Sequence, residues 1–343
     1  MYKKDRSAKI EKGLNQTSSA DSLFHMNEKE AGEAREILRR RLAEKPEIQE
    51  LLKNHRSKEK TMDNLSVLQD TLQIFENGYY YVNGQRKNLK LSPGQYTQAK
   101  VILPGELCHL LQGSEENRKI YSCTYLCENL DSYAMAEKLS TDSDIPVLVL
   151  NLANPVNPGG GVRKGAKAQE EDLCRRSSLL LSLESEEART YYRYNKSLHT
   201  YMGSDALILT PHTEVIKRPD GSLLEDSLIV SVLTCAAPMI TYGKEGMSEE
   251  EYTSMVAQRI RGMLCAAICF GYTRLVLGAW GCGAFSNDAR VISDLFAQVL
   301  QSSYGDHRLC DYFEVISFAV LDHSTKQYNY REFARNFGGK DVG

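Results

Sequence analysis

Three successive glycines follow a strongly apolar run near the middle of the chain, and they are the first residues that suggest chemistry. The run Val147–Leu152 has the composition of a buried strand, and it leads through Asn154 and two prolines to the glycines at positions 159–161. Glycine has no side chain to hold a ligand away from the backbone, and it tolerates positive φ angles. Amides at the carboxyl end of a strand can cradle a sugar or an anion. A flexible surface loop is the alternative interpretation of the glycines alone.

Two adjacent carboxylates follow ten residues after the glycines, in Gln169-Glu170-Glu171. Taken alone, such a pair usually marks a solvated helix start, where the helix dipole favours negative charge. The pairing with the glycine loop makes a functional role the stronger hypothesis.

A second glycine-rich loop follows the apolar run Leu275–Leu277, with glycines at positions 278, 281 and 283. A helix is expected to begin near Asp288, and amides at a helix N-terminus suit a phosphate group. A tight strand–helix turn is the alternative. We expect Trp280, the only tryptophan of the chain, to pack in the core and Phe285 to contact a ligand. Cys282 is interpreted as a small residue that fills the loop rather than as a nucleophile.

The elements that must position these loops are predicted from apolar runs and helix signals. Strands are expected at Val147–Leu152, Ala206–Leu209, Leu228–Leu233, Leu275–Leu277 and Val315–Leu321. Helices are expected at Leu65–Phe75, Ser248–Phe270 and about Asp288–Leu300, with a hairpin over residues 79–84. A capping box of Ser248 and Glu251 and a glycine at position 271 support the second helix. Continuous apolar strands that alternate with helices predict a three-layer α/β domain.

Composition and missing motifs exclude several classes of protein. The 343 residues carry a formal charge of −3, which argues against a protein that grips nucleic acid by its phosphates. The chain has no P-loop, no GxGxxG after a strand, no GxSxG elbow, and no HExxH or clustered Cys/His metal site. No apolar run approaches the ~20 residues that cross a bilayer.

Two further expectations concern the compartment and the domains. The nine cysteines form no framework and the first residues are polar, so we expect reduced thiols in a cytoplasmic protein. Residues 1–60 are rich in charge, and we expect them to form a partly disordered or helical leader. The globular domain is then expected over residues 61–343.

Together the motifs resemble those of the poly(ADP-ribose) glycohydrolase family. Asn151-Leu-Ala-Asn154, a spacer and Gly159-Gly-Gly-Val162 resemble the macrodomain signature that embraces the distal ribose of ADP-ribose. Three glycines, seven residues and Gln169-Glu170-Glu171 resemble the catalytic signature, and Trp280-Gly-Cys-Gly-Ala-Phe285 is similar to the diphosphate-binding loop. The resemblance covers roughly residues 61–335 and is greatest to the microbial branch.

The resemblance implies a macrodomain-like α/β/α fold in three layers, with a mixed central sheet and an N-terminal helical extension. The implied reaction is hydrolysis of the ribose–ribose O-glycosidic bond in poly(ADP-ribose), releasing ADP-ribose. Its catalytic residues would be Glu171, as proton donor, and Glu170, which would hold ribose hydroxyls. The implied ligand-binding residues are Asn154, Gly159, Gly160, Gly161, Val162, Gln169, Gly281, Cys282, Gly283, Ala284 and Phe285, with Phe318 as a candidate to stack on adenine.

The chemistry of the reaction agrees with this assignment. Glycoside cleavage passes through an oxocarbenium-like transition state, and its leaving group needs a proton that a carboxyl group can supply before it deprotonates water. No cofactor and no metal are expected. The expected ligand is ADP-ribose or its polymer, an ADP-ribosylated protein is a further candidate partner, and neither a membrane nor a direct grip on nucleic acid is expected. The sequence leaves open a mono-ADP-ribosyl hydrolase that acts on modified protein or nucleic acid, and a non-catalytic ADP-ribose-binding module.

Overall fold

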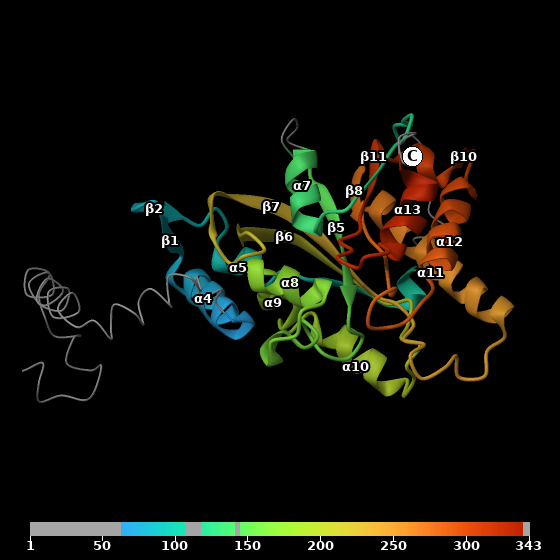
Figure 1. Ribbon diagram of the computed structural model, residues 1–343, viewed down its shortest axis with the longest axis horizontal. Helices are drawn as coiled ribbons and strands as arrows, with labels where there is room; N and C mark the ends of the chain where they lie inside the picture. Colours follow the sequence, from blue (N-terminus) through green and yellow to red (C-terminus); the bar gives the residue numbers. More distant parts are fainter. Residues whose placement is uncertain (1–62, 108–117, 141–144, 339–343) are drawn as a thin grey trace, which may run out of the picture. The chain divides into compact units, whose positions relative to one another are not determined.

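A seven-stranded mixed sheet is the frame of the protein, which was analysed as a computed structural model that describes residues 63–107, 118–140 and 145–338 (Figure 1). The predictions for residues 1–60 lie outside the described residues. The strand order is β3 (Lys100–Ile102), β6 (Leu207–Lys217), β7 (Leu223–Ala236), β5 (Val147–Ala153), β8 (Arg274–Leu277), β11 (Val315–Ala319) and β4 (Thr124–Glu128). The pairs from β7 to β4 are parallel, whereas β3–β6 and β6–β7 are antiparallel.

Alternate residues of the central strand β5 pack into two separate apolar clusters, one on each face of the sheet. Leu148 and Leu150 pack into the cluster formed with α11 (Glu249–Cys269), α12 (Ala289–Gln301) and α13 (Tyr328–Phe337). Val147 and Val149 pack into the cluster formed with α7 (Ser132–Ser140), α8 (Gln169–Arg176), α9 (Leu179–Leu183) and α10 (Arg189–Ser197). Side chains of a strand alternate between faces, so a run that is apolar throughout needs cover on both. The predicted three-layer α/β/α fold with a mixed sheet is confirmed.

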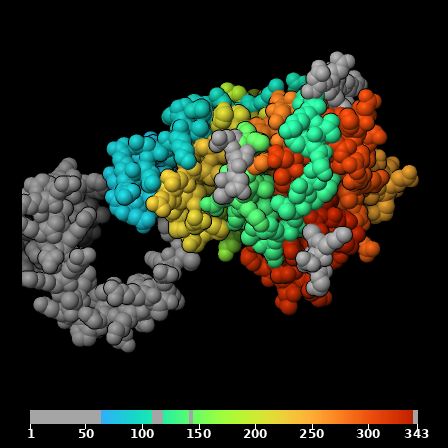
Figure 2. All heavy atoms as spheres, turned by 90° about the horizontal axis from the view of Figure 1, so that it is seen from above, coloured from blue at the N-terminus to red at the C-terminus, as the bar shows by residue number. Residues whose placement is uncertain are grey.

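An N-terminal extension of the domain consists of α4 (Asn64–Asn77), the hairpin β1 (Tyr79–Val82) and β2 (Gln85–Asn88), and the short α5 (Pro93–Tyr96). Helix α4 begins at the N-cap Asp63 and ends at Gly78, whose φ of 77° is the left-handed conformation that glycine favours. The buried ammonium of Lys217 on β6 lies 2.6 Å from Asp70 and 2.8 Å from Thr71, which ties α4 to the sheet. In Figure 2 the blue to cyan residues of this extension lie against the yellow residues that join β6 and β7.

The strongest sequence signals are reproduced, with their ends shifted. Helix α11 begins with the predicted capping box of Ser248 and Glu251, and α12 begins at the N-cap Asp288. Strands β6 and β7 run well beyond the predicted ranges 206–209 and 228–233. The predicted ranges were too short because buried polar residues such as Glu214 interrupt the apolar pattern from which strands were recognised. Glu214 is fully buried, and its carboxylate accepts hydrogen bonds from the backbone of Lys90 and Leu91.

Several elements had no sequence prediction because they are short or lie at the edges of the domain. They are β3, β4, α5, α7, α9, α10, α13, the two-residue strands β9 (Ser303–Tyr304) and β10 (His307–Arg308), and the 3-10 helices η2 (Val162–Lys164) and η3 (Leu309–Tyr312). Strand β11 ends at Ala319, two residues before the predicted end, and the chain beyond it lines the candidate site described below. Within the three described ranges, no helix has the length and apolar character needed to cross a membrane.

Candidate active site

A cavity of about 680 Å³ opens where the parallel strands end. Its walls include Leu152 among the last residues of β5, Asn154 directly after β5, Ala279 after β8, and residues 319–321 at the end of β11. The first turn of α8 supplies a further wall with residues 169–172. Ligands of open α/β sheets bind outside the carboxyl ends of the strands, and a cavity of this volume is typical of a small-molecule site.

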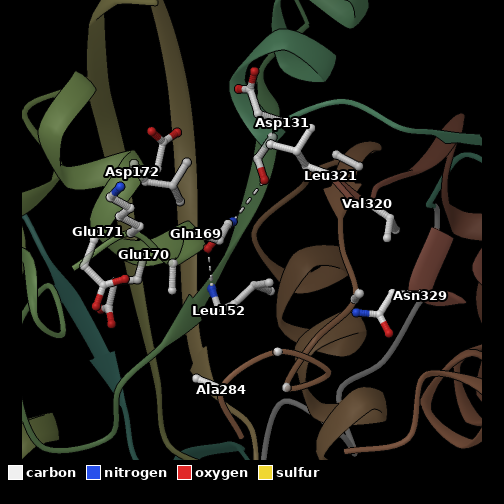
Figure 3. Close-up of a pocket in the computed structure, with 18 of the residues that line it drawn as sticks. Asp131, Leu152, Gln169, Glu170, Glu171, Asp172, Ala284, Val320, Leu321 and Asn329 are labelled. Atoms are coloured by element: carbon white, nitrogen blue, oxygen red, sulfur yellow. Dashed lines mark hydrogen bonds between the residues drawn. The ribbon is translucent and has the colours of Figure 1, made fainter. Parts of the chain in front are cut away.

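The two predicted carboxylates both line this cavity from α8 (Figure 3). Figure 3 shows the Glu170 and Glu171 side chains pointing the same way, while Asp172 on the same turn points in the opposite direction. Both residues are buried, with 3% and 7% of their surfaces exposed. The solvated helix start that is usual for such a pair is therefore ruled out by their burial.

Glu170 is held by hydrogen bonds to both of its carboxyl oxygens. The backbone N–H of Asn154 donates to Oε2 across 2.7 Å, and the Asn151 side chain donates to Oε1 across 3.3 Å. Burial, with a smaller contribution from the nearby Glu171 carboxyl, raises the pKa of Glu170 from 4.5 to about 8 against the opposing effect of these donors. A carboxyl group with this pKa carries a proton at neutral pH.

Glu171 differs from its neighbour in having one oxygen engaged and one without a partner. The backbone N–H of Gly161 donates to Oε1 across 2.7 Å. Oε2 is buried and forms no hydrogen bond to any residue that the structure describes. A buried oxygen without a partner is costly, and at the wall of a cavity it is available to a ligand.

The glycines at 159–161 make room for these carboxylates. Gly159 and Gly160 have φ angles of 65° and 58°, which favour glycine. A methyl group added to Gly160 would overlap Glu171 Oε1 and would lie 3.0 Å from Glu170 Oε2. A side chain is therefore excluded at Gly160 because the carboxyl groups of α8 pack directly on its backbone, whereas Leu180 and Ala166 leave no room for one at Gly159 and Gly161.

Gln169 fixes the start of α8 against β5. Its amide oxygen accepts a hydrogen bond from Leu152 N across 2.9 Å, and its amide nitrogen donates to Leu150 O and to Ser132 Oγ across 2.8 and 3.0 Å (Figure 3). All its polar atoms face protein groups, although the residue also lines the cavity. This geometry makes Gln169 a brace between the strand and the helix that carries the carboxylates.

The second glycine loop forms another part of the cavity wall. Gly281, Gly283, Ala284 and Phe285 line the cavity, as predicted for a ligand-contacting loop. Trp280 is fully buried and donates from Nε1 to the carbonyl oxygen of Cys235 across 3.0 Å, so its predicted core role is confirmed. Cys282 does not line the cavity, and burial raises the pKa of its thiol, which agrees with a filling role rather than a nucleophilic one.

Some predicted ligand-binding residues lie behind the cavity wall. Val162 is fully buried in the apolar cluster beneath α8, and neither it nor the glycines at 159–161 line the cavity in this structure. The candidate for adenine stacking, Phe318, is wrong. Its ring is fully buried and stacks on Phe337 with centroids 4.1 Å apart, because β11 directs it into the core under α13.

Other residues of the site were missed by the sequence motifs. Asp131 and Ser132 at the start of α7 line the cavity, as do Lys167, His323 and Asn329 (Figure 3). They come from loops and helix ends that have no glycine-rich motif, so only the fold brings them together. Asn151 was quoted in the motif but given no role, and it is fully buried between Glu170 and Thr234. In the described part of the chain, no three His, Cys, Asp or Glu side chains are grouped to hold a metal ion.

Comparison with known proteins agrees with this geometry. Residues 68–218 match the family model described as the catalytic domain of microbial-type PARG. A crystal structure of poly(ADP-ribose) glycohydrolase from Thermomonospora curvata, bound to the inhibitor ADP-HPD, is 30% identical, with a TM-score of 0.72 over 80% of this chain and 99% of that chain. The chain belongs to the microbial-type poly(ADP-ribose) glycohydrolase family.

A second solved member of the glycohydrolase family supports the same conclusion. The enzyme from Deinococcus radiodurans, in complex with ADP-ribose, is 30% identical, with a TM-score of 0.66 over 73% of this chain and 98% of that chain. No curated protein matches the chain. The macrodomain-like fold and the prediction of an enzyme of the poly(ADP-ribose) glycohydrolase class are thereby confirmed.

Proposed function

We propose that this protein hydrolyses the ribose–ribose O-glycosidic bond of poly(ADP-ribose) and releases ADP-ribose, with Glu171 as the general acid and base. The observation that carries the proposal is the buried, unpartnered Oε2 of Glu171 at the wall of the cavity. Because Gly161 holds Oε1, the free oxygen has a fixed direction. A positioned carboxyl group of this kind can exchange a proton with a bound sugar oxygen and with water.

The reaction would follow the usual course of glycoside cleavage. Glu171 gives its proton to the leaving ribose oxygen as the bond to the anomeric carbon breaks, and the sugar develops oxocarbenium character. The carboxylate left behind stabilises this positive charge, and then takes a proton from the water that attacks the same carbon. Glu171 thereby regains its proton when ADP-ribose is released.

Glu170 would act beside this acid as a neutral group that holds the substrate. With its pKa near 8, it carries a proton at neutral pH and can donate a hydrogen bond to a ribose hydroxyl. The two carboxyl groups are thus assigned different roles by their different partners.

The ligand is proposed to occupy the cavity whose wall includes the first turn of α8 and the second glycine loop. Asn154 is proposed to orient the distal ribose, and residues 281–285 are proposed to surround the diphosphate and the proximal ribose. Support comes from their position in the cavity wall and from family members bound to ADP-ribose or to ADP-HPD. Asp131, Ser132 and Asn329 complete the polar part of the wall from α7 and from the start of α13.

Side-by-side activity measurements test the proposed function. The protein is incubated with poly(ADP-ribose) and, separately, with a mono-ADP-ribosylated protein, and free ADP-ribose is quantified by chromatography. We expect rapid release from the polymer and little release from the protein-linked unit. Release from the mono-ADP-ribosylated protein alone would favour the mono-ADP-ribosyl hydrolase, and tight ADP-ribose binding without any release would favour the binding module.

Three further proposals concern the partner, the domain bounds and the location of the protein. An ADP-ribosylated protein is proposed as the carrier of the polymer, and the domain is proposed to span residues 61–343. A cytoplasmic location is also proposed, and cell fractionation tests it. Each of these can fail without affecting the assignment of the cavity.

A further inference from the structure

Two exposed tyrosines form a pair close to the cavity, outside the residues that line it. Tyr201 and Tyr242 are 52% and 75% exposed, and their ring centroids lie 5.3 Å apart with an angle of 53° between the rings. Exposed aromatic rings can stack on a flat partner, and each nucleobase offers such a face. An aromatic pair of this kind needs an explanation that core packing does not supply.

The segment that leads to Tyr242 is hydrogen-bonded to the second glycine loop of the candidate site. Met239 N donates to Tyr201 O across 2.9 Å, Ile240 N donates to Phe285 O across 3.0 Å, and the Thr241 hydroxyl donates to Ala284 O across 2.9 Å. The segment that leads to Tyr242 is therefore bonded to the wall formed by residues 284–285.

On the other side, the segment that carries Tyr201 lies against the loop after β5. A β-carbon added to Gly203 would lie 3.8 Å from Pro155, the residue that follows Asn154. The Glu245 carboxylate fixes this segment, because it accepts hydrogen bonds from Thr200 Oγ1 and Tyr201 N across 2.6 and 2.7 Å. The pair thus lies next to the loop proposed to hold the distal ribose, which is the sugar at the scissile bond.

A row of basic side chains on α10 leads to the same place. Arg189, Arg193 and Lys196 are spaced by four and three residues, so they share one exposed face of the helix. Arg193 and Lys196 form no ion pair with any described residue. The exposed His199 follows the end of α10. The Ser204 hydroxyl donates a hydrogen bond to Asn195 Oδ1 across 2.8 Å, which holds the segment after Tyr201 against α10. In Figure 1, the end of α10 and the loop that leads into α11 lie at the same lower edge of the molecule.

We propose that Tyr201 and Tyr242 bind the adenine of the ADP-ribose unit on the leaving side of the scissile bond, and that the basic face of α10 binds the diphosphate of that unit. The inference rests on the proposed function, because cleavage separates the unit in the cavity from the unit that carries the rest of the polymer. The leaving unit begins with the adenosine ribose, so its base must lie close to the distal-ribose loop.

The test compares substrates with and without a leaving-group base. Tyr242→Ala, and the double variant with Tyr201→Ala, should raise KM for poly(ADP-ribose) by about five- to 150-fold, the range expected for loss of one base–aromatic stack. Cleavage of an aryl ADP-ribose, whose leaving group has no adenine, and affinity for ADP-ribose should both stay within about twofold. Tyr242→Phe should retain wild-type KM. Tyr81→Ala is the matched control, because Tyr81 is a 59% exposed ring on β1 that also contacts a second tyrosine.

Binding of end-labelled polymer is measured in parallel by anisotropy. Arg193→Glu with Lys196→Glu should weaken polymer binding and reduce its dependence on salt, because fewer phosphate contacts are made. Unchanged polymer KM and affinity in the tyrosine variants, or an equal loss on the aryl substrate, would overturn the inference. If the wild-type protein cleaved neither substrate, the proposed function would fail, and the anisotropy comparison would still decide the role of the tyrosine pair.

Discussion

The backbone N–H of Gly161 donates a hydrogen bond of 2.7 Å to Oε1 of Glu171, whereas Oε2 of the same carboxyl is buried and has no hydrogen-bond partner among the described residues. The glycine loop and the first turn of α8 are therefore one structural unit, although ten residues separate their ends. The loop sets the direction of the carboxyl, and the helix sets its position. Changes in the loop should thus affect catalysis even at residues that do not line the cavity.

Gly160→Ala should lower kcat without unfolding the domain. The methyl group would overlap Glu171 Oε1, and the φ of 58° at this position costs an alanine roughly 1–2 kcal/mol. We expect at least a tenfold loss of kcat, because a small displacement of a catalytic group has a large effect on rate. Steady-state kinetics and thermal melting measure both effects.

Gly94→Ala is the control for this substitution. Gly94 has no heavy atom within 4 Å of an added methyl group and no positive φ. It should leave kcat unchanged. Wild-type kcat in Gly160→Ala would show that the glycine loop does not position Glu171.

Glu170→Gln should change how stability depends on pH. The pKa of Glu170 is raised from 4.5 in the unfolded chain to about 8 in the folded protein. The folded state therefore holds the proton more tightly, and the stabilisation that is complete below about pH 4.5 is lost as pH rises toward 8. The slope is at most about 1.4 kcal/mol per pH unit.

Glutamine cannot titrate, so the variant should lack this loss. Its stability relative to the wild type should rise between pH 5 and pH 8, as measured by urea unfolding at several pH values. Glu225→Gln, at an exposed position of β7, should follow the wild-type curve. Parallel curves for Glu170→Gln and the wild type would contradict a protonated Glu170.

The two glycine loops show which parts of the site could be predicted from local sequence patterns. A buried strand followed by glycines is a local pattern, so β5, β8 and the cavity-lining residues Gly281, Gly283, Ala284 and Phe285 were found from sequence. The carboxylates Glu170 and Glu171 were found because they follow the first glycine loop at a short spacing. What the pattern could not show is which atoms the glycines make room for, because the contact between Gly160 and Glu171 depends on the packing of α8.

Residues from distant elements had no local signal. Asp131 and Asn329 reach the cavity from the starts of α7 and α13, and neither belongs to a motif. Phe318 was misplaced for a related reason: a strand end places alternate residues on opposite faces, and sequence alone did not show that this ring faces α13. Buried polar residues such as Glu214 likewise hid the true length of β6.

Phe285→Ala should weaken ADP-ribose binding. Phe285 lines the cavity and is partly buried, so loss of its ring removes apolar contact with the ligand, by about 1–3 kcal/mol in binding free energy. Calorimetry measures the affinity. Phe270→Ala is the control, because Phe270 is also partly buried and does not line the cavity. Equal affinity in Phe285→Ala and the wild type would assign the ring to packing alone.

Activity should survive incubation with EDTA. The proposed mechanism uses carboxyl groups, and the described residues include no group of three potential ligands. Rates before and after chelation, with and without added Mg²⁺ or Mn²⁺, provide the measurement. Inactivation by EDTA that either ion reverses would contradict the carboxylate mechanism.

Glu171→Gln should abolish turnover and keep ligand binding. The amide has the shape of the carboxyl group but has no proton to give, and a general acid and base contributes about 10²–10⁴-fold to the rate. An alkoxide leaving group depends strongly on protonation, so we expect the upper part of this range. ADP-ribose is a product and needs no proton to bind, so its affinity should change little.

Loss of kcat with retained affinity is the result expected when an interaction made only in the transition state is removed. Glu170→Gln should differ, because a group that holds ribose hydroxyls acts on both the bound substrate and the transition state, so KM should rise as kcat falls. The glutamine at position 171 can still accept the hydrogen bond from Gly161 N, so the loop should stay in place and the circular dichroism spectrum should be unchanged. Near-wild-type turnover in such a folded variant would remove Glu171 from the role of acid and leave Glu170, whose pKa lies near 8, as the residue to test next.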